Sequence, residues 1–322
     1  MSEDRAMLEI YKRYHPPLNT RFEHEVKEYW GKPWGLDTEV GTLRTVMLHK
    51  PSNEIHAIQP PYERWRYNEK PDLQEMQRDH DNLAEAFKQE HVEVIERMPE
   101  TGENARLVKS IYTRDPSFAI PGGVIIGRLY DSLRRGEEAY ALQTLAAIGC
   151  PIIRTVNGSG TAEGGSIMWL DPSHLAIGIS FRVNEEGARQ VEEVIHASGP
   201  DIKILKTPLT GGHIDPYICM VDKRTISIDR RGIEAPFFEY LTKSLRYKII
   251  ERKQDDYVAA VALKPGRVMM ASGEDKKSGI RLLESEGIDV IQVSIDSLVG
   301  PRNSGSIHCL TMPIMRDSET GT

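Results

Sequence analysis

The feature of the sequence that most restricts its fold is a unit that recurs along the chain. In each copy a short apolar strand leads through a polar loop to an amphipathic helix, a glycine or polar corner, and a second strand rich in Val and Ile. The clearest copy has strands at 268–271 and 288–293 around a helix at 278–285. The other four copies have first strands at 45–49, 124–127, 175–178 and 225–228, helices at 73–90, 137–149, 187–199 and 236–245, and second strands at 92–98, 152–156, 202–205 and 247–251.

Five alternating strand and helix units fit two architectures. One is a closed ring of blades, and the other is a single doubly wound α/β sheet, whose segments also resemble one another. Fivefold recurrence favours the ring, so we expect a five-bladed α/β propeller with a pseudo-fivefold repeat of strand–helix–strand units. A chain of 322 residues is long enough to bury the core that either architecture needs.

Polar motifs follow the second strand in four of the five units. They are YTRDP at 112–116, EGG at 163–165, GGHID at 211–215, and the loop NSGSIHC at 303–309, whereas the fifth unit is followed only by YVAAVAL at 257–263, which indicates packing. Equivalent positions of a ring converge on its axis, so a ring would bring two carboxylates, a histidine and a thiol into one pocket. A thiolate is a nucleophile, His carries protons near neutral pH, and carboxylates orient His or hold a cation.

The three cysteines, Cys150, Cys219 and Cys309, are widely spaced, which argues against a disulfide framework and against a CxxC metal site. Cys150 and Cys219 lie in apolar stretches and are expected in the core. Cys309 differs, because the preceding Ser-Gly-Ser lets backbone N–H groups approach its sulfur.

Composition and net charge limit which binding partners and which cellular compartment are expected. A formal net charge of −7 argues against nucleic acid and anionic membranes as partners and leaves small molecules, including cations. The sequence has no run of about 18 apolar residues, and its charged start, MSEDRAMLEIYKRYH, does not fit a signal peptide, so we expect a cytoplasmic protein. The sequence leaves open whether the chain is a homo-oligomer.

The ordered set YTRDP, EGG, GGHID and SGSIHC, with the opening WGLDTEVGTLRTVMLHKP at 34–51, resembles the guanidine-modifying enzymes of the pentein fold. This superfamily includes arginine deiminase, dimethylarginine dimethylaminohydrolase and the amidinotransferases, and the motifs are most similar to arginine deiminase. The resemblance runs from about Trp34 to Pro313. It implies one catalytic domain over residues 1–322, with a pentein core at about 34–315 and an N-terminal extension at 1–33.

The resemblance also implies roles for individual residues. Cys309 would be the nucleophile, His213 the acid that protonates the departing amine, and Glu163 the carboxylate that orients His213. Asp115 and Asp215 would hold the guanidinium group, and Arg134 and Arg182 would bind the substrate carboxylate. From the sequence, the two arginines can also be read as a solvated helix-start charge and as a salt-bridge partner of 185–186. The implied chemistry needs no cofactor and no metal.

The implied reaction is hydrolysis of a free guanidino amino acid, with arginine favoured because a dimethylated nitrogen has no N–H for Asp215. An amidinotransferase, a dimethylarginine dimethylaminohydrolase and a guanidino-compound binding protein are the alternatives. The chain departs from the family at Ser166, where Asp is common, at Pro216, and in lacking the helical insertion of bacterial arginine deiminases. The loop at 59–70 fits either a lid over the pocket or a surface connection.

Overall fold

A computed structural model describes residues 3–14, 20–102, 106–199, 201–300 and 303–318. Its strands form five separate three-stranded sheets. The sheets are β15 (Met312–Arg316), β1 (Leu43–Leu48) and β2 (Glu93–Glu96); β3 (Ser117–Ile120), β4 (Gly123–Ile126) and β5 (Ile152–Thr155); β6 (Ile167–Asp171), β7 (His174–Ile179) and β8 (Lys203–Pro208); β9 (Ile218–Asp222), β10 (Thr225–Ile228) and β11 (Lys248–Glu251); and β12 (Ala260–Lys264), β13 (Arg267–Ala271) and β14 (Asp289–Val293).

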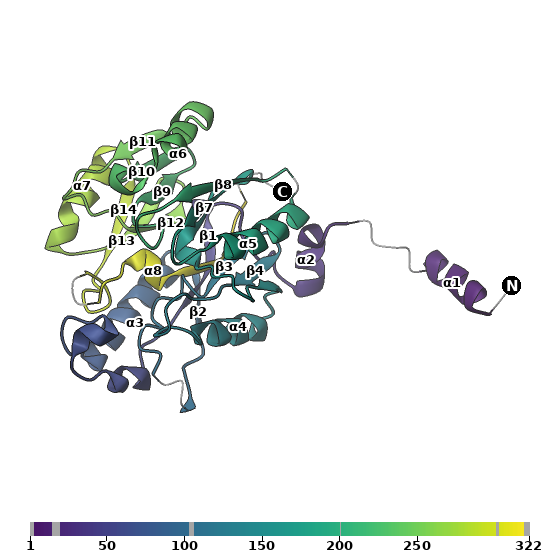
Figure 1. The fold of residues 1–322 in the computed structure, drawn as a ribbon, viewed down its shortest axis with the longest axis horizontal. Helices are drawn as coiled ribbons and strands as arrows, with labels where there is room; N and C mark the ends of the chain where they lie inside the picture. The colour runs from purple at the N-terminus through teal and green to yellow at the C-terminus, as the bar shows by residue number, and fades with distance from the viewer. Residues whose placement is uncertain (1–2, 15–19, 103–105, 200, 301–302, 319–322) are drawn as a thin grey trace.

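All five sheets share one plan. The central strand pairs antiparallel with one neighbour and parallel with the other, as when β7 pairs antiparallel with β6 and parallel with β8. A parallel pair needs a crossover connection, and one helical segment supplies it in each sheet (Figure 1). The crossover helices are α3 (Leu73–Gln89), α4 (Glu137–Ala147), α5 (Glu185–Ser198), α6 (Ala235–Glu239) with the π-helical turn Tyr240–Ser244, and α7 (Lys277–Ser285).

The remaining helices are short or lie at the N-terminal end. Among the described residues, α1 (Glu3–Tyr14) stands apart from the rest of the fold (Figure 1). In contrast, α2 (Phe22–Trp30) lies against the body that carries the five sheets, near α5. The helix α8 (Ile307–Leu310) carries the cysteine of the last motif. Short 3₁₀ turns occur at Asn53–Ala57, Tyr62–Trp65, Gly164–Ser166, Arg230–Gly232 and Glu274–Lys276.

Local sequence explains why the crossover segments are helical. The side chain of Asp72 accepts a hydrogen bond from the backbone N–H of Glu75, 3.0 Å away, and thereby caps the first turn of α3. Asn184 caps α5 in the same way through Gly187, at 2.8 Å. The buried positions of α5, among them Val191, recur at helical spacing, so one face packs on the sheet.

The predicted repeat is confirmed, and each copy contains one more strand than the sequence indicated. The ten predicted strands correspond to the central and parallel strands of the five sheets, while the antiparallel strands β3, β6, β9, β12 and β15 were not predicted. The alternative of one doubly wound sheet is wrong, because the strands form five sheets. The segment YVAAVAL enters β12 and is buried at 258–263, as its composition predicted.

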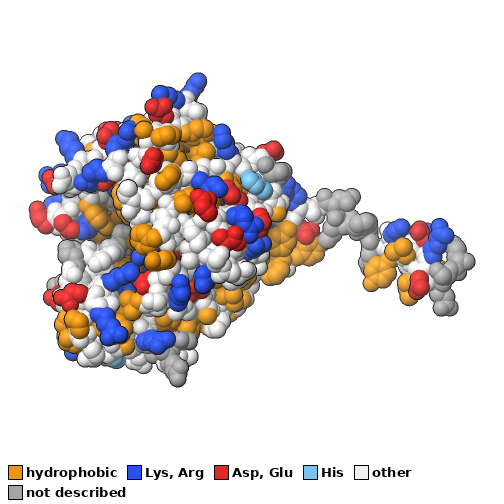
Figure 2. Space-filling model, viewed as in Figure 1, with side chains coloured by type: hydrophobic (Ala, Val, Ile, Leu, Met, Phe, Trp, Pro, Cys, Tyr) orange, Lys and Arg blue, Asp and Glu red, His pale blue; other side chains and the backbone are white. Residues whose placement is uncertain are grey.

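The surface agrees with the modest net charge. Acidic and basic side chains alternate over the visible face (Figure 2), as expected for a chain with both signs in similar numbers. Within the described residues, no helix has the length and apolar character needed to cross a membrane.

Candidate active site

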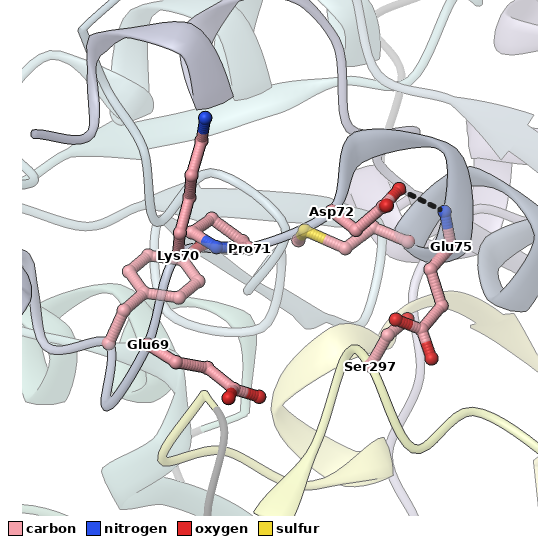
Figure 3. Close-up of a pocket in the computed structure, with 8 residues that line it drawn as sticks. Glu69, Lys70, Pro71, Asp72, Glu75 and Ser297 are labelled. Carbon is pink, nitrogen blue, oxygen red and sulfur yellow. Dashed lines mark hydrogen bonds between the residues drawn. The ribbon is translucent and has the colours of Figure 1, made fainter.

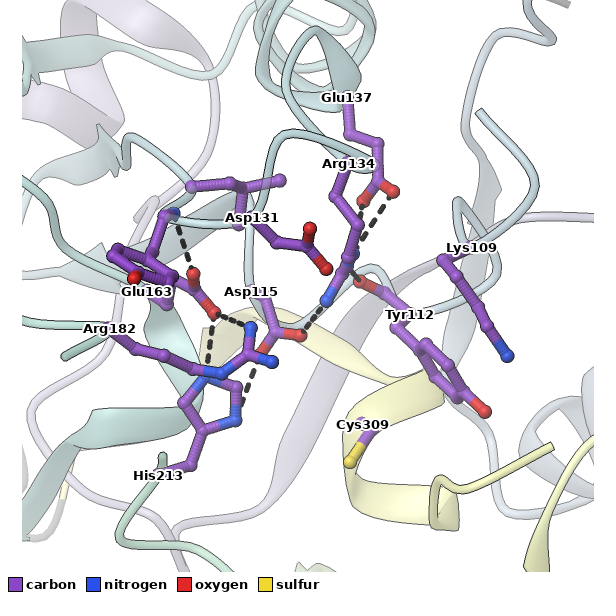
Figure 4. A network of polar contacts seen from close by, with 12 residues as sticks. Lys109, Tyr112, Asp115, Asp131, Arg134, Glu137, Glu163, Arg182, His213 and Cys309 are labelled. Carbon is purple, nitrogen blue, oxygen red and sulfur yellow. Dashed lines mark hydrogen bonds and ion pairs between the residues drawn. The ribbon is translucent and has the colours of Figure 1, made fainter. Parts of the chain in front are cut away.

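The four motifs occupy equivalent places in four sheets. Asp115 precedes β3, Glu163 precedes β6, His213 and Asp215 precede β9, and Cys309 precedes β15, each within five residues of the strand. Their elements bring Asp115, His213 and Cys309 from distant parts of the chain to one cavity of about 110 Å³ (Figure 4), whereas Glu163 and Asp215 lie behind these residues and are not among the described lining residues. The cavity is lined by Arg66, Lys109, Tyr112, Asp115, Arg134, Arg182, His213, Asn303, Ser304, Gly305 and Cys309.

Glu163 is the buried partner of His213. Its Oε2 lies 2.7 Å from Nε2 of His213 and accepts a hydrogen bond from Nη1 of Arg182 at 2.8 Å, while its Oε1 accepts from the backbone N–H of Tyr130. Burial opposes ionisation of Glu163, but its hydrogen bond with His213 and the charges of His213 and Arg182 together outweigh that effect and hold the carboxyl pKa below its usual value. This contact fits the predicted orienting role.

His213 lies between two carboxylates. Burial alone would lower the pKa of His213, but the charge of Asp115 and the hydrogen bond to Glu163 outweigh burial and raise it. Its Nδ1 is 3.8 Å from Oδ1 of Asp115. The imidazole is therefore held in its protonated form over a wider pH range than a free histidine, as a general acid requires.

Asp115 is paired with Arg134 in this structure. Nη1 of Arg134 donates to Oδ2 of Asp115 at 2.5 Å, and the same guanidinium donates to Glu137 and to the carbonyl of Tyr112. Burial would raise the pKa of Asp115, but the charges of His213 and Arg134 lower it. Arg134 and Arg182 are thus both paired with carboxylates of the site. The readings of Arg134 as a solvated charge and of Arg182 as a partner of 185–186 are wrong, because Arg134 is buried and Arg182 pairs with Glu163.

Asp215 is held by a residue that the sequence analysis did not select. Its Oδ2 lies 2.8 Å from Nδ1 of His308, whose Nε2 lies 2.9 Å from Nη2 of Arg114. His308 directly precedes Cys309, and Arg114 directly precedes Asp115, so adjacency to the motif residues was the available signal. This chain of contacts fixes the orientation of the Asp215 carboxylate.

Two carboxylate oxygens of the site are buried without a hydrogen-bond donor among the described residues, although one of them lies 3.8 Å from Nδ1 of His213. Within the described part of the chain, Oδ1 of Asp115 and Oδ1 of Asp215 have no hydrogen-bond partner. A buried acceptor without a donor is costly, so such atoms mark a place where a ligand donor is expected. Two such oxygens suit a planar cation with N–H groups on different sides.

Cys309 lies in the first turn of α8. The side chain of Ser306 accepts from the backbone N–H of Cys309 at 3.4 Å, and its Oγ is 3.3 Å from the sulfur. Burial, together with the charges of Asp215 and Asp115, raises the pKa of the thiol to about 12. In the unliganded protein the sulfur is therefore a thiol, and a positive charge near it would favour the thiolate.

A family model described as arginine deiminase matches residues 106–242 and 245–316, which is more than half of the chain. The chain belongs to the arginine deiminase family. Within this family it is 23% identical to an arginine deiminase of Rhodococcus erythropolis, covering 88% of this chain and 98% of the relative. That alignment spans 403 positions, more than the 322 residues here, so the relative contains additional segments.

Other similar proteins are consistent with a place for this chain in the pentein superfamily. An uncharacterized protein, YkgA of Bacillus subtilis, is 25% identical over 87% of this chain and 94% of its own. A mutant dimethylarginine dimethylaminohydrolase from Pseudomonas aeruginosa, complexed with citrulline, superposes with a TM-score of 0.68 at 19% identity, covering 85% and 100% of the chains. The amidinotransferase SxtG of Microseira wollei has a TM-score of 0.68 at 15% identity, covering 90% and 99%. These structural likenesses show the fold.

The other two cysteines of this arginine deiminase family member are buried in the core, as predicted. Burial raises the pKa of Cys150 to about 12 and that of Cys219 to about 11. Ser166, at the position where the family commonly has Asp, is fully buried and donates to the carbonyl of Gly212 at 3.3 Å. Ser166 therefore supports the loop that carries His213.

A buried charged cluster lies outside the cavity, where β1 and β2 end. Nε2 of His49 is 3.3 Å from Glu54 and 3.4 Å from Glu100, and Arg97 contacts Glu100. The spacing of His49, Glu54 and Glu100 would suit a metal ion, as would that of Asp115, Glu163 and His213. In the first cluster the hydrogen bonds to Glu100 and Glu54 overcome burial and raise the pKa of His49, which favours its protonated form, and Arg97 supplies a further positive charge beside Glu100.

A second cavity, of about 200 Å³, lies at the start of α3 (Figure 3). Its lining includes the loop residues Glu69 and Lys70, the capping pair Asp72 and Glu75, and Ser297. The Asp72 carboxylate is used for the helix cap, and none of the four motifs reaches this cavity. We therefore assign the chemistry to the cavity around Cys309. The loop at 59–70 borders that cavity through Arg66.

Proposed function

We propose that this chain hydrolyses the guanidino group of a free amino acid, with arginine as the favoured substrate and citrulline and ammonia as products. Family membership supports a guanidino-group-modifying enzyme. The observation that carries the finer proposal is a pair of buried carboxylate oxygens that accept no hydrogen bond from the described residues. One belongs to Asp115, which lines the cavity with His213 and Cys309, and the other to Asp215, whose charge acts on Cys309 and His213. Each oxygen would accept N–H groups of an unsubstituted guanidinium. We also propose that the five sheets surround one axis as a propeller. The pairing of β15, near the end of the chain, with β1 would close the ring.

Binding would activate the nucleophile. A guanidinium between the two carboxylates places a positive charge near the sulfur, which lowers the thiol pKa and favours the thiolate. The thiolate forms a bond to the central guanidinium carbon, His213 protonates one terminal nitrogen, and ammonia leaves. His213 then takes a proton from water, whose oxygen attacks the same carbon. The carbon–sulfur bond breaks, and citrulline and the Cys309 thiol result.

The two arginines have to share their present partners with the substrate. The guanidinium of Arg134 lies against Asp115 in this structure, where the substrate guanidinium is proposed to bind. We propose that the substrate replaces Arg134 at Asp115, which frees Nη1 of Arg134 for the substrate carboxylate while Glu137 retains the rest of its guanidinium. Arg182 would bind the carboxylate while keeping its contact with Glu163 through Nη1.

Product analysis tests the proposal. Purified protein is incubated with arginine, methylated arginines and agmatine, and citrulline, ornithine and ammonia are measured, with Cys309→Ser as control. Citrulline and ammonia from arginine, lost in the variant, would support the deiminase. Ornithine released only when an amine such as glycine is added would indicate an amidinotransferase. Binding of arginine by thermal shift without any product would indicate a binding protein.

The N-terminal extension offers a further test, because the catalytic core is predicted at about 34–315. Within the described ranges 3–14 and 20–33, no residue lines the cavity around Cys309. A chain that begins at residue 34 is therefore expected to keep the activity, provided that it folds, and a folded but inactive truncation would contradict this boundary.

A further inference from the structure

A buried lysine joins two loops at the edge of the cavity. Nζ of Lys109 donates to Oδ1 of Asn303 at 2.6 Å, to the carbonyl of Asn303 at 3.2 Å and to the carbonyl of Arg66 at 2.8 Å. It also lies 3.6 Å from the ring centroid of Tyr67. Lys109 is 2% exposed, and among the described residues none of its side-chain contacts is with a carboxylate. A lysine is rarely buried in this way without an acidic partner.

Asn303 begins the described part of the loop that leads to Cys309. The hydroxyl of Tyr112 donates to the carbonyl of Asn303 at 2.5 Å, and Asn303 is fully buried. The loop then packs on the same tyrosine, because a Cβ on Gly305 would lie 2.2 Å from the Tyr112 ring. Ser304, between them, has a positive φ of 58°. The loop is therefore held closely at one point, six residues before the nucleophile.

We infer that Lys109 is a positioning residue for Cys309, and that it acts by holding Asn303 and thereby the conformation of the nucleophile loop. Figure 4 shows Lys109 beside Tyr112, with its nitrogen directed away from the carboxylates of the site. Removing Nζ leaves the oxygens of the buried Asn303 and the carbonyl of Arg66 without this donor, which favours movement of the loop. A displacement of about 1 Å at the nucleophile can cost about 100-fold in rate. The kinetic part of the inference rests on the proposed function.

Hydrogen bonding, and not attraction of an anion, explains this arrangement. Burial and the nearby charges of Arg134 and Arg66 lower the pKa of Lys109 to about 6, although Glu137 opposes them. At neutral pH the amine is thus largely uncharged, and its two N–H groups can serve two of the three acceptor oxygens at a time. An uncharged amine attracts a substrate carboxylate weakly, but it continues to hold Asn303.

The experiment uses two readouts on the full chain. The first is the rate at which iodoacetamide alkylates Cys309, followed by mass spectrometry, which needs no substrate. The second is kcat and KM for the guanidino compound that the protein turns over. The variants are Lys109→Met, Asn303→Ala and their combination. Lys243→Met is the control for loss of a lysine, because that side chain is 72% exposed and lies on the helical turn Tyr240–Ser244.

Loosening the loop exposes the sulfur to water, which removes part of the burial that raises its pKa. We expect alkylation about 10-fold faster in Lys109→Met and in Asn303→Ala, kcat lower by about 10- to 100-fold, and KM within about 3-fold. Because both variants break the same contact, the combined variant should be no worse than either single one. Lys243→Met should match the wild type in both readouts.

Several results would overturn the inference. Unchanged alkylation in folded Lys109→Met and Asn303→Ala would show that the lysine does not position the loop. A raised KM with unchanged kcat would assign Lys109 to substrate binding, and effects that multiply in the combined variant would show independent roles. Thermal unfolding checks folding, and Asn303→Ala serves if Lys109→Met does not fold. If the protein turns over no guanidino compound, the proposed function fails while the alkylation rates still decide this inference.

Discussion

The thiol of Cys309 should ionise more easily when a guanidinium ion binds beside it. In the unliganded protein, burial and the charges of Asp215 and Asp115 raise its pKa from a usual value of 9.0 to about 12. This difference corresponds to about 4 kcal/mol against the thiolate, at about 1.4 kcal/mol for each factor of ten. At pH 8 only about one sulfur in 10,000 would then be ionised.

A bound cation can offset most of this cost. A unit positive charge about 4 Å from the sulfur contributes about 4 kcal/mol at an effective dielectric constant of about 20. It also neutralises the carboxylates of Asp115 and Asp215 that oppose ionisation. Some of this gain is lost in desolvating the ligand, so we expect the pKa of Cys309 to fall from about 12 to about 9–10 when guanidinium binds.

The assay follows the ultraviolet absorbance of the thiolate against pH, with millimolar guanidinium chloride or urea. Urea has a similar planar shape without the charge, so it separates the electrostatic effect from occupancy. Subtracting the titration of Cys309→Ser removes the contributions of tyrosines and of Cys150 and Cys219. The reasoning is refuted if guanidinium binds by calorimetry and the pKa does not move, if urea lowers it equally, or if the free thiol already titrates near neutral pH.

Two further predictions concern stability and its pH dependence. Glu100→Gln should lower the free energy of unfolding in urea at pH 7 by about 3–5 kcal/mol, because Glu100 is the buried partner of His49 and Arg97. The pKa of Glu100 is lowered to about 2, since its contacts with His49 and Arg97 outweigh burial. The difference in unfolding free energy between variant and wild type should therefore shrink as the pH falls from about 4.5 towards 2. A difference that stays constant over this range would contradict the reasoning. The raised pKa of His213 should stabilise the protein fully below pH of about 6.5 and progressively less as pH rises through the folded-state pKa. In urea unfolding from pH 6 to 9, the loss of unfolding free energy caused by His213→Ala should therefore become smaller as the pH rises. A loss that grows with pH would show that the pKa of His213 is lowered in the folded protein.

Much of the fold could be predicted because its signals are local. The apolar strands and amphipathic helices of the five units depend on residues a few positions apart, so the central and parallel strands of all five sheets are visible in the sequence. The antiparallel strands are not, because they are only four or five residues long and all except β12 lie next to the polar motifs. A segment such as Ser117–Ile120 is recognised as a strand only through its pairing with Gly123–Ile126.

The sequence by itself determined the residue types of the site and their order, since the spacing of YTRDP, EGG, GGHID and SGSIHC is written in the chain. Only the tertiary structure decided which side chains meet. His308 holds Asp215 from 93 positions away, and Lys109 holds Asn303 from 194 positions away. Such contacts depend on how separate sheets pack around the cavity, and no local pattern encodes that packing. The same packing left two buried carboxylate oxygens without a hydrogen-bond partner in the described part of the chain, which is why a cation is expected there.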